Sequence, residues 1–355
     1  MTTLLLPVYL RIKDVRKTRP SLNDVAKMAG VSKSTASRVI NNKLGNGFSV
    51  REEVRQQVLN AAKQLNYRPN IFAQSLTKHR TRMIHVVGGQ DALSDLGNIY
   101  QTIINEATKV LASGSEPFDV TVDMLHTAPD TSELPSWKID GAIILSLCSP
   151  VTMTELTQGQ IPYVVVNGPC EQTGSSVVPD DIEGTKLAVK HLVELGHKRI
   201  AYTGPRTVHM VGHSSIKDRH GTYLSELDKF GLTPIEGHDQ ILHSAHNFLE
   251  TAVVKNKATA VITYGHMEGL NIMQAAHDMQ ISIPEDLSLI SFCDEVASAV
   301  MSSKLTFIDL RSREMGKIAA ELLLEQIESH SKAEPQFIKV TEHLIVRNST
   351  AQPKV

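Results

Sequence analysis

The chain has 355 residues, of which 41% are hydrophobic, and this length excludes a single small domain while fitting two or three. Its formal net charge of −2 conceals an asymmetry, because residues 11–82 carry 16 Lys and Arg against 4 Asp and Glu, whereas the remainder carries 20 against 34. This basic head on an acidic body concentrates the attraction for phosphate at one end of the chain.

Residues 1–19 are expected to form a flexible basic arm. The apolar run Leu4–Leu10 has no basic residue before it and no small-residue cleavage site after it, so it does not match an export signal. No stretch is long and apolar enough to span a membrane. The cysteines lack a spacing suited to zinc or redox chemistry, and they are Cys148, Cys170 and Cys293. We expect a cytoplasmic, nucleoid-associated protein without metal or cofactor.

Residues 20–41 predict two short helices joined by a tight turn at Gly30. Ser21 and Asp24 have the spacing of a capping box at the start of the first helix. Small apolar residues recur at helical spacing in both helices, which allows the close crossing of a helix-turn-helix. The second helix carries side chains suited to base edges and phosphate oxygens, namely Lys33, Ser34, Ser37 and Arg38.

A third helix and a linker are expected to follow. Ser49 and Glu52 have capping-box spacing and would begin a helix in which Val54, Val58 and Leu65 repeat at helical spacing. Residues 20–68 are therefore assigned to a DNA-binding domain and residues 69–81 to a hinge. Within the hinge, residues 71–77 are long enough for one or two helical turns, which would be stable only against a partner copy and DNA.

From Met83 the pattern changes to short buried strands that alternate with helices. Strands are expected at 83–87, 120–124, 142–147, 163–167, 200–203, 260–263 and 287–292, and helices include 99–111, 184–195 and 220–230. This alternation predicts α/β architecture, with parallel sheets covered by helices on both faces and divided into two lobes. Ligands of such folds bind at the carboxyl ends of the strands, in the crevice where the lobes meet.

Several motifs occur at the spacing of a known family. In the head they are Asp24-Val25-Ala26, Ala29-Gly30-Val31-Ser32 and Thr35-Ala36-Ser37-Arg38-Val39, and weaker matches are Ile139-Asp140-Gly141, Leu195-Gly196-His197 and Pro284-Glu285-Asp286-Leu287-Ser288. With these motifs the chain resembles the lactose-repressor/galactose-repressor (LacI/GalR) family of bacterial transcription regulators. The resemblance implies an all-α helix-turn-helix headpiece and a two-lobed body like that of periplasmic binding proteins. The body would span 82–355, with an N-lobe at about 82–179 and 308–335 and a C-lobe at about 180–307 and 336–350.

The resemblance further implies a homodimer whose recognition helices contact the half-sites of a near-palindromic operator in double-stranded DNA. Leu76 matches the leucine that family members wedge into the minor groove, although a helix–helix contact in the dimer is an alternative. Gln74 departs from the arginine common in the family, and Ser37 is equally compatible with a phosphate anchor. The residues implied to bind DNA are Ser21, Asn23, Lys33, Ser34, Thr35, Ser37, Arg38, Asn41, Ala73, Gln74 and Leu76.

The implied effector cleft departs from the family pattern. Asp218 stands where members carry an arginine three residues before a Gly-aromatic pair, and Cys293 replaces an aspartate. The lost contacts make a free hexose an unsuitable ligand. Two interpretations remain open: a cationic or nitrogen-rich ligand near Asp180, Asp218 and the histidines, or a cleft without a small-molecule role. The implied lining residues are Gly89, Gln90, Asn167, Asp180, Asp218, His243, Gly265, His266, Cys293 and Asp294.

Three classes of function follow from these observations. The first is a dimeric repressor controlled by a small molecule, with a change in operator affinity of roughly 5–150-fold. The second is a DNA-binding protein that is constitutive or controlled by a partner protein. The third, an enzyme or exported binding protein, is disfavoured because the sequence has no phosphate-binding Gly-rich loop, nucleophile elbow or metal-spaced histidine pair.

Overall fold

The computed structural model describes residues 20–41, 49–68, 80–88, 98–123, 131–132, 134–168, 174–205, 213–235, 244–301, 304–329 and 334–354. Contacts divide the chain into two compact units, Met1–His79 and Arg80–Val355, which are called the headpiece and the body below. The predicted arm at 1–19 and hinge helix at 71–77 lie outside the described residues, as do six predicted site residues. These six are Ala73, Gln74, Leu76, Gly89, Gln90 and His243.

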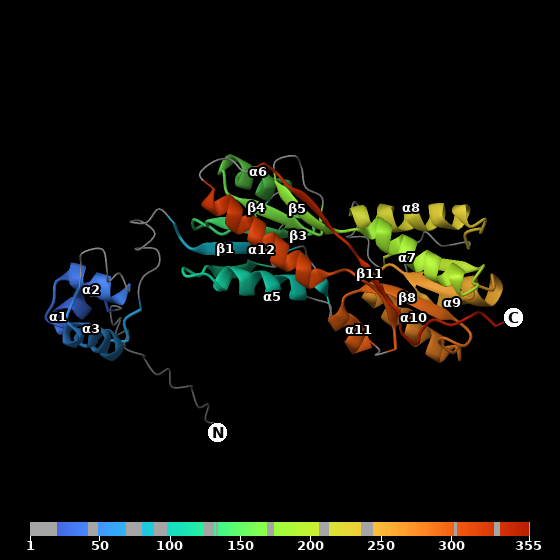
Figure 1. Ribbon diagram of the computed structural model, residues 1–355, viewed down its shortest axis with the longest axis horizontal. Coiled ribbons are helices and arrows are strands. Elements are labelled where there is room, and N and C mark those ends of the chain that lie inside the picture. Colours follow the sequence, from blue (N-terminus) through green and yellow to red (C-terminus); the bar gives the residue numbers. More distant parts are fainter. Residues whose placement is uncertain are drawn as a thin grey trace, which may run out of the picture. The chain divides into compact units, whose positions relative to one another are not determined.

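The headpiece consists of three helices in its described part, α1 (Leu22–Met28), α2 (Lys33–Ile40) and α3 (Glu52–Gln64) (Figure 1). The predicted capping box of α1 is confirmed: the Ser21 backbone N–H donates to Asp24 Oδ2 over 2.8 Å, and the Asp24 N–H donates to Ser21 Oγ over 3.3 Å. All three helices contribute to one small apolar core. Its buried residues are Val25, Ala26, Ala36, Val39, Val58 and Ala61.

The predicted capping box of Ser49 and Glu52 is wrong. Helix α3 has Arg51 as its N-cap residue and no side-chain cap bond. Glu52 is already the first helical residue, and its carboxylate accepts a hydrogen bond from Gln56 Nε2 over 2.9 Å. The hydrogen bond to Gln56, one turn later in the helix, therefore competes with the bond that the Glu52 carboxylate would need to make to the backbone N–H of Ser49 in a capping box.

The first lobe of the body contains a six-stranded parallel sheet in the order β10-β5-β4-β3-β1-β2. Buried residues alternate between its two faces, so that Leu145 and Val164 pack with helices α5 and α12 while Ile144 and Val165 pack under α6. The strands are β1 (Met83–Gly88), β2 (Asp119–Asp123), β3 (Gly141–Leu145), β4 (Tyr163–Val166), β5 (Ser175–Pro179) and β10 (Phe337–Val340), and the helices are α5 (Ile99–Ala112), α6 (Pro150–Gln158) and α12 (Ser312–Glu328).

The second lobe contains a five-stranded sheet in the order β11-β9-β8-β7-β6, in which only β11 is antiparallel to its neighbour. Helices α7 and α8 cover one face, and α9 and α10 cover the other (Figure 1). The strands are β6 (Ile200–Thr203), β7 (Ala260–Thr263), β8 (Ser288–Cys293), β9 (Thr306–Asp309) and β11 (His343–Ile345). The helices are α7 (Asp181–Glu194), α8 (Ser214–Lys229), α9 (Ala245–Leu249), a π-helical turn at Glu250–Lys255, α10 (His266–Asp278) and α11 (Glu295–Met301). The predicted α/β two-lobed architecture is confirmed.

The lobe boundaries differ from the prediction at two places. Strand β9 remains in the second sheet as far as Asp309, beyond the expected limit of 307. The segment 336–350, expected wholly in the second lobe, is divided, because β10 pairs with β5 in the first sheet and β11 pairs with β9 in the second. Strand β10 is a mostly exposed edge strand of four residues, so it lacks the buried run that identifies a strand in sequence.

Helices α5 and α12 pack side by side on the first sheet (Figure 1). Their close approach occurs at Gly316, where an added Cβ atom would lie 2.5 Å from the backbone oxygen of Ile103. Backbone cannot move aside as a flexible side chain can, so this glycine sets the distance between the helices.

We expect Gly316→Ala to lower the free energy of unfolding of the body by about 1–3 kcal/mol, because the added methyl group overpacks the helix contact. Gly221→Ala on α8 is the matched control, since no atom lies within 4 Å of the Cβ it would add. There the gain in helix propensity should stabilise by roughly 0.5–1 kcal/mol. Urea unfolding of both variants measures the difference, and equal effects would contradict the packing argument.

Candidate DNA-binding surface and interlobe cleft

The turn between α1 and α2 is set by local bonds. Gly30 adopts φ +63°, a left-handed conformation that favours glycine, and the Val31 N–H donates to the Ala26 carbonyl over 3.0 Å. Ser32 then caps α2, since its Oγ accepts from the Thr35 N–H over 3.1 Å. The geometry of the predicted helix-turn-helix is therefore encoded within about a dozen neighbouring residues.

The predicted DNA contacts of the headpiece differ in exposure. Thr35, Ser37 and Asn41 are half-buried, and the Asn41 amide donates to the Ser37 carbonyl over 2.8 Å at the end of α2. The remaining five are exposed on the described headpiece: Ser21, Asn23, Lys33, Ser34 and Arg38. Lys33 and Arg38 are the long cationic side chains of α2, whereas Ser34 and Thr35 share hydrogen bonds with Ser32 Oγ.

The first lobe presents two strained residues at the carboxyl ends of its central strands. Ser146 after β3 and Asn167 after β4 adopt φ values of +63° and +54°, and both are buried. Such conformations are uncommon outside glycine and concentrate at functional sites. The Asn167 amide donates to Tyr100 Oη over 2.9 Å, which fixes the predicted cleft residue Asn167 against α5.

The second lobe places a buried ion pair at the corresponding end of its sheet. Arg219 on α8 donates through Nε to Asp181 Oδ1 over 2.6 Å and through a terminal nitrogen to the backbone oxygen of Tyr264, directly after β7. Its guanidinium lies 4.2 Å from the centre of the Phe292 ring. Burial disfavours the charge of Arg219, but the surrounding negative groups, Asp181 first, outweigh this effect and raise its pKa.

Arg219 corrects one inference from the sequence, which placed Asp218 where family members carry an arginine. The buried aromatic residue of α8 is Tyr223, and one helical turn before it lies Arg219. The arginine is thus present, one position later than the motif count indicated. Asp218 is half-buried beside it, and its pKa is raised by burial and then by the charge of Asp181.

A hydrogen-bonded chain crosses from one lobe to the other. His213 Nε2 lies 2.5 Å from the backbone oxygen of Asn167, so this nitrogen carries the proton. His213 Nδ1 then accepts from Ser215 Oγ, and Ser215 Oγ accepts from Tyr264 Oη, with both distances 2.6 Å. Burial lowers the pKa of His213 and favours this neutral form. None of these three side chains was assigned to a connection between the lobes from the sequence, because their spacing follows no motif.

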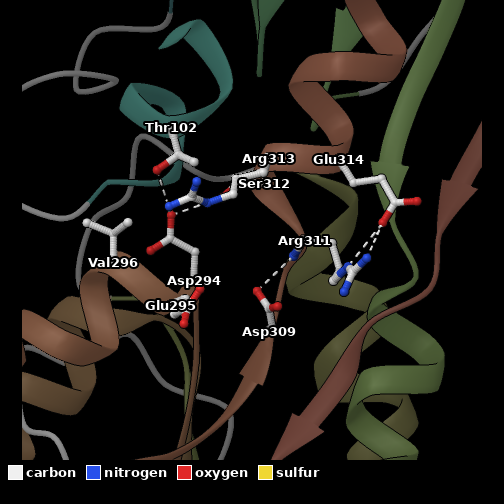
Figure 2. A pocket seen from close by; sticks show the side chains of 9 residues that line it. All are labelled: Thr102, Asp294, Glu295, Val296, Asp309, Arg311, Ser312, Arg313 and Glu314. Atoms are coloured by element: carbon white, nitrogen blue, oxygen red, sulfur yellow. Dashed lines mark hydrogen bonds and ion pairs between the residues drawn. The ribbon is translucent and has the colours of Figure 1, made fainter. Parts of the chain in front are cut away.

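Asp294 forms a second polar connection between the lobes (Figure 2). Its Oδ2 accepts from Thr102 on α5 and from Ser312 at the start of α12, both over 2.9 Å, and its Oδ1 accepts from the Ala297 N–H over 2.7 Å. A cavity of about 210 Å³ adjoins this junction. The Asp294 carboxylate, a predicted effector contact, is therefore already engaged by groups of the protein.

The other predicted cleft residues lie at helix starts or in the core. Asp180 caps α7 and lies 3.7 Å from Lys339, while Gly265 and His266 are the N-cap and first residue of α10, both half-buried. Cys293 is fully buried in the apolar cluster of the second lobe, and burial raises the pKa of its thiol. Asn167 and Gly265 thus lie directly after the carboxyl ends of β4 and β7, whereas Cys293 is buried in the core.

Glu342 is a buried carboxyl at the segment that joins β10 to β11. Neither of its oxygens has a hydrogen-bond partner within the described ranges, and Oε2 packs against Gly184 of α7, where an added Cβ would lie 1.5 Å from it. Burial raises its pKa, the charge of Asp181 raises it further, and Arg219 acts in the opposite direction. Glu342 was not identified from the sequence, because glutamate is usually exposed and a single glutamate in a short loop follows no motif.

Two negative findings apply to the described part of the chain. It contains no group of three or more His, Cys, Asp or Glu residues arranged to hold a metal ion. It also contains no helix with the length and apolar character needed to cross a bilayer.

Comparisons with known proteins match both units. A family model for bacterial regulatory proteins, lacI family, matches residues 21–70, and one for a periplasmic binding protein-like domain matches residues 189–350. The HTH-type transcriptional regulator RegA of Clostridium saccharobutylicum is 28% identical over 93% of this chain and 99% of its own. The HTH-type transcriptional repressor PurR of Haemophilus influenzae is also 28% identical, over 93% of this chain and 98% of its own. These relatives are transcription regulators rather than enzymes.

Solved structures share the architecture. A complex of the transcriptional regulator CelR with cellobiose has a TM-score of 0.63 and 25% identity, covering 93% of this chain and all of that one. The Lac repressor dimer bound to operator and the anti-inducer ONPF has a TM-score of 0.72 over 94% of this chain and 99% of that one, and its 23% identity supports the fold alone. Headpiece and body together define a DNA-binding transcription regulator with an effector-binding domain. Residues 21–70 form a DNA-binding domain of the lacI family of bacterial regulatory proteins, and the rest of the chain is similar to the bodies of such regulators.

We expect Arg38→Ala to weaken specific DNA binding by about 1–3 kcal/mol if the guanidinium contacts a base, while the thermal melt followed by circular dichroism stays nearly unchanged. Lys63→Ala, which removes an exposed cation from α3, is the matched control for charge alone. Fluorescence anisotropy on specific and scrambled duplexes separates the two variants. Undiminished specific affinity of the Arg38 variant would refute its role.

The free energy of unfolding of the Glu342→Gln variant, compared with that of the parent protein, should increase as pH rises from 5 to 8. The folded parent keeps the Glu342 proton above the ordinary pKa of 4.5, whereas the unfolded chain releases it, so the parent loses stability with rising pH. Each unit of pKa difference corresponds to about 1.4 kcal/mol. Melting curves across this range measure the effect, and the exposed Glu285→Gln should show a flat difference. A flat difference for both would contradict the buried-carboxyl argument.

Proposed function

We propose that the protein is a homodimeric repressor whose affinity for a near-palindromic operator changes when a small molecule binds in the cleft between the lobes. The observation that carries this proposal is the polar contact of His213 with Asn167 across the lobes. A ligand that alters the lobe positions must exchange such bonds, and polar bonds can be exchanged at small net cost because each contributes only about 0.5–1.5 kcal/mol. Coupling of about 1–3 kcal/mol is sufficient for regulation.

The proposed DNA contacts follow the headpiece geometry. Lys33, Ser34 and Arg38 would contact base edges from the major groove, and Ser21 and Asn23 would contact phosphates at the start of α1. In the proposed dimer, Leu76 of each copy would enter the central minor groove and bend the operator. The Lac repressor dimer bound to its operator supplies the precedent for twofold presentation of such headpieces.

A second candidate function is a regulator without a small effector, controlled by a partner protein or constitutive. One observation favours it: Arg219, Asn167 and His213 all bond to other groups of the protein. A ligand would have to compete with these bonds for the same atoms. Small-molecule stabilisation of the body separates the two candidates.

The proposed function is tested by selecting bound sequences from random duplex DNA with the purified full chain. We expect a near-palindrome, and we expect a duplex with one intact half-site to bind at least 100-fold more weakly, because a dimer makes both contacts in one event. The affinity for the full site should fall steeply with salt as condensed counterions are released. Selection of an asymmetric site, or equal affinity for full and half sites, would refute dimeric operator binding.

A further inference from the structure

The surroundings of Arg219 hold more carboxyl groups than cations. Arg219 pairs with Asp181, and Lys339 lies 3.7 Å from Asp180. Within the ranges that the structure describes, neither Asp218 nor Glu342 makes an ion pair or a side-chain hydrogen bond. The charge of Asp181 raises the pKa of both carboxyls, so a further negative charge is disfavoured at either site until a cation joins it. The cleft side of the second lobe is therefore short of positive charge.

The same region has hydrogen-bonding oxygens that the described protein groups do not use. Besides the two Glu342 oxygens, the hydroxyls of Tyr202 and Thr203 have no hydrogen-bond partner among the described residues. All three side chains are at most 1% exposed. Tyr202 and Thr203 lie at the carboxyl end of β6, beside the β7 end that holds Arg219. The ionised carboxylate of Glu342 would accept hydrogen bonds only, and hydroxyls accept as well as donate, so a donor group suits this set of oxygens.

Other ligand charges do not fit this environment. An anion would have to take Arg219 from Asp181, and the carboxylates of Asp181 and Asp218 would then be left without a cation. A neutral sugar would add no positive charge, so the carboxyl groups would still outnumber the cations around it. A metal ion does not fit either, because the described residues contain no group of three or more His, Cys, Asp or Glu that could hold one. An organic ammonium group supplies both the positive charge and up to three N–H donors.

Building on the proposed function, we propose that the cleft binds a small organic cation whose ammonium group is held by Asp181 and Asp218. Arg219 would turn from Asp181 toward the unpartnered carboxyl of Glu342, with which it already interacts electrostatically. As Arg219 pairs with it, Glu342 would release its proton to solvent, so that the ligand exchanges one buried ion pair for two and every charge retains a partner. Because Arg219 also holds the Tyr264 carbonyl, the exchange would reach the hydrogen-bonded chain between the lobes.

The test uses the full chain and matched ligands at equal ionic strength. Glucosamine, glucose and glucose 6-phosphate share one ring and differ in charge, and putrescine and 1,4-butanediol form a second pair. Thermal melts should show saturable stabilisation by at least one of the two amines and none by its neutral counterpart. Absence of stabilisation by both amines, or equal stabilisation by a neutral or anionic member, overturns the proposal.

Two variants distinguish the site from general attraction of amines to an acidic protein. Asp218→Asn should lower the affinity for the active amine at least tenfold and, without ligand, should raise the melting temperature, because it removes an unmatched charge. Asp228→Asn changes an exposed carboxylate on the same helix and should alter neither quantity. Equal losses of affinity in the two variants would assign the binding to surface charge and overturn the proposal.

Operator binding in the same samples separates this proposal from the proposed function. An amine that binds through Asp218 but leaves operator affinity unchanged would refute effector control while the cation site stands. A neutral sugar that changes operator affinity would refute the cation site while effector control stands.

Discussion

The buried ion pair of Arg219 and Asp181 is the interaction on which the cleft depends. Both side chains are about 95% removed from solvent, so neither charge is stable there without the other. Removing one partner of such a pair typically costs about 3–5 kcal/mol, because the remaining charge is left uncompensated. The rings of Phe292 and Tyr264 flank the guanidinium and exclude water from it. This pair fixes α8 to the start of α7 and so positions Asp218 and His213 on the same helix start.

Polar contacts link the two lobes beside a buried apolar cluster that includes residues of both, such as Ile84 and Ile262. His213 contacts the Asn167 carbonyl, and Asp294 joins Thr102 to Ser312 (Figure 2). Apolar packing favours a single arrangement, since interiors are close-packed and respond to small changes in volume. Hydrogen bonds between small side chains can instead be replaced by others of similar free energy. The polar contacts, rather than the apolar cluster, are therefore the ones that could exchange partners between two states.

Local signals explain what the sequence revealed. The capping box of Ser21, the turn at Gly30 and the buried strand runs depend on neighbours within a few residues, and these predictions are confirmed. The failures have a different origin. Ser49 and Glu52 had the correct spacing, but Gln56 competes for the carboxylate. Arg219, Glu342 and strand β10 acquire their roles from partners distant in sequence, and no spacing rule reports such contacts.

Strands β10 and β11 are separated by two residues yet belong to different sheets. The final part of the chain therefore completes the edge of the first lobe before it completes the edge of the second. Neither lobe is a continuous stretch of sequence, so neither is encoded by one uninterrupted stretch of coding sequence. A single recombination crossover therefore cannot exchange one lobe intact with that of a relative. At least two crossovers are needed, so the two halves of the body tend to be inherited together.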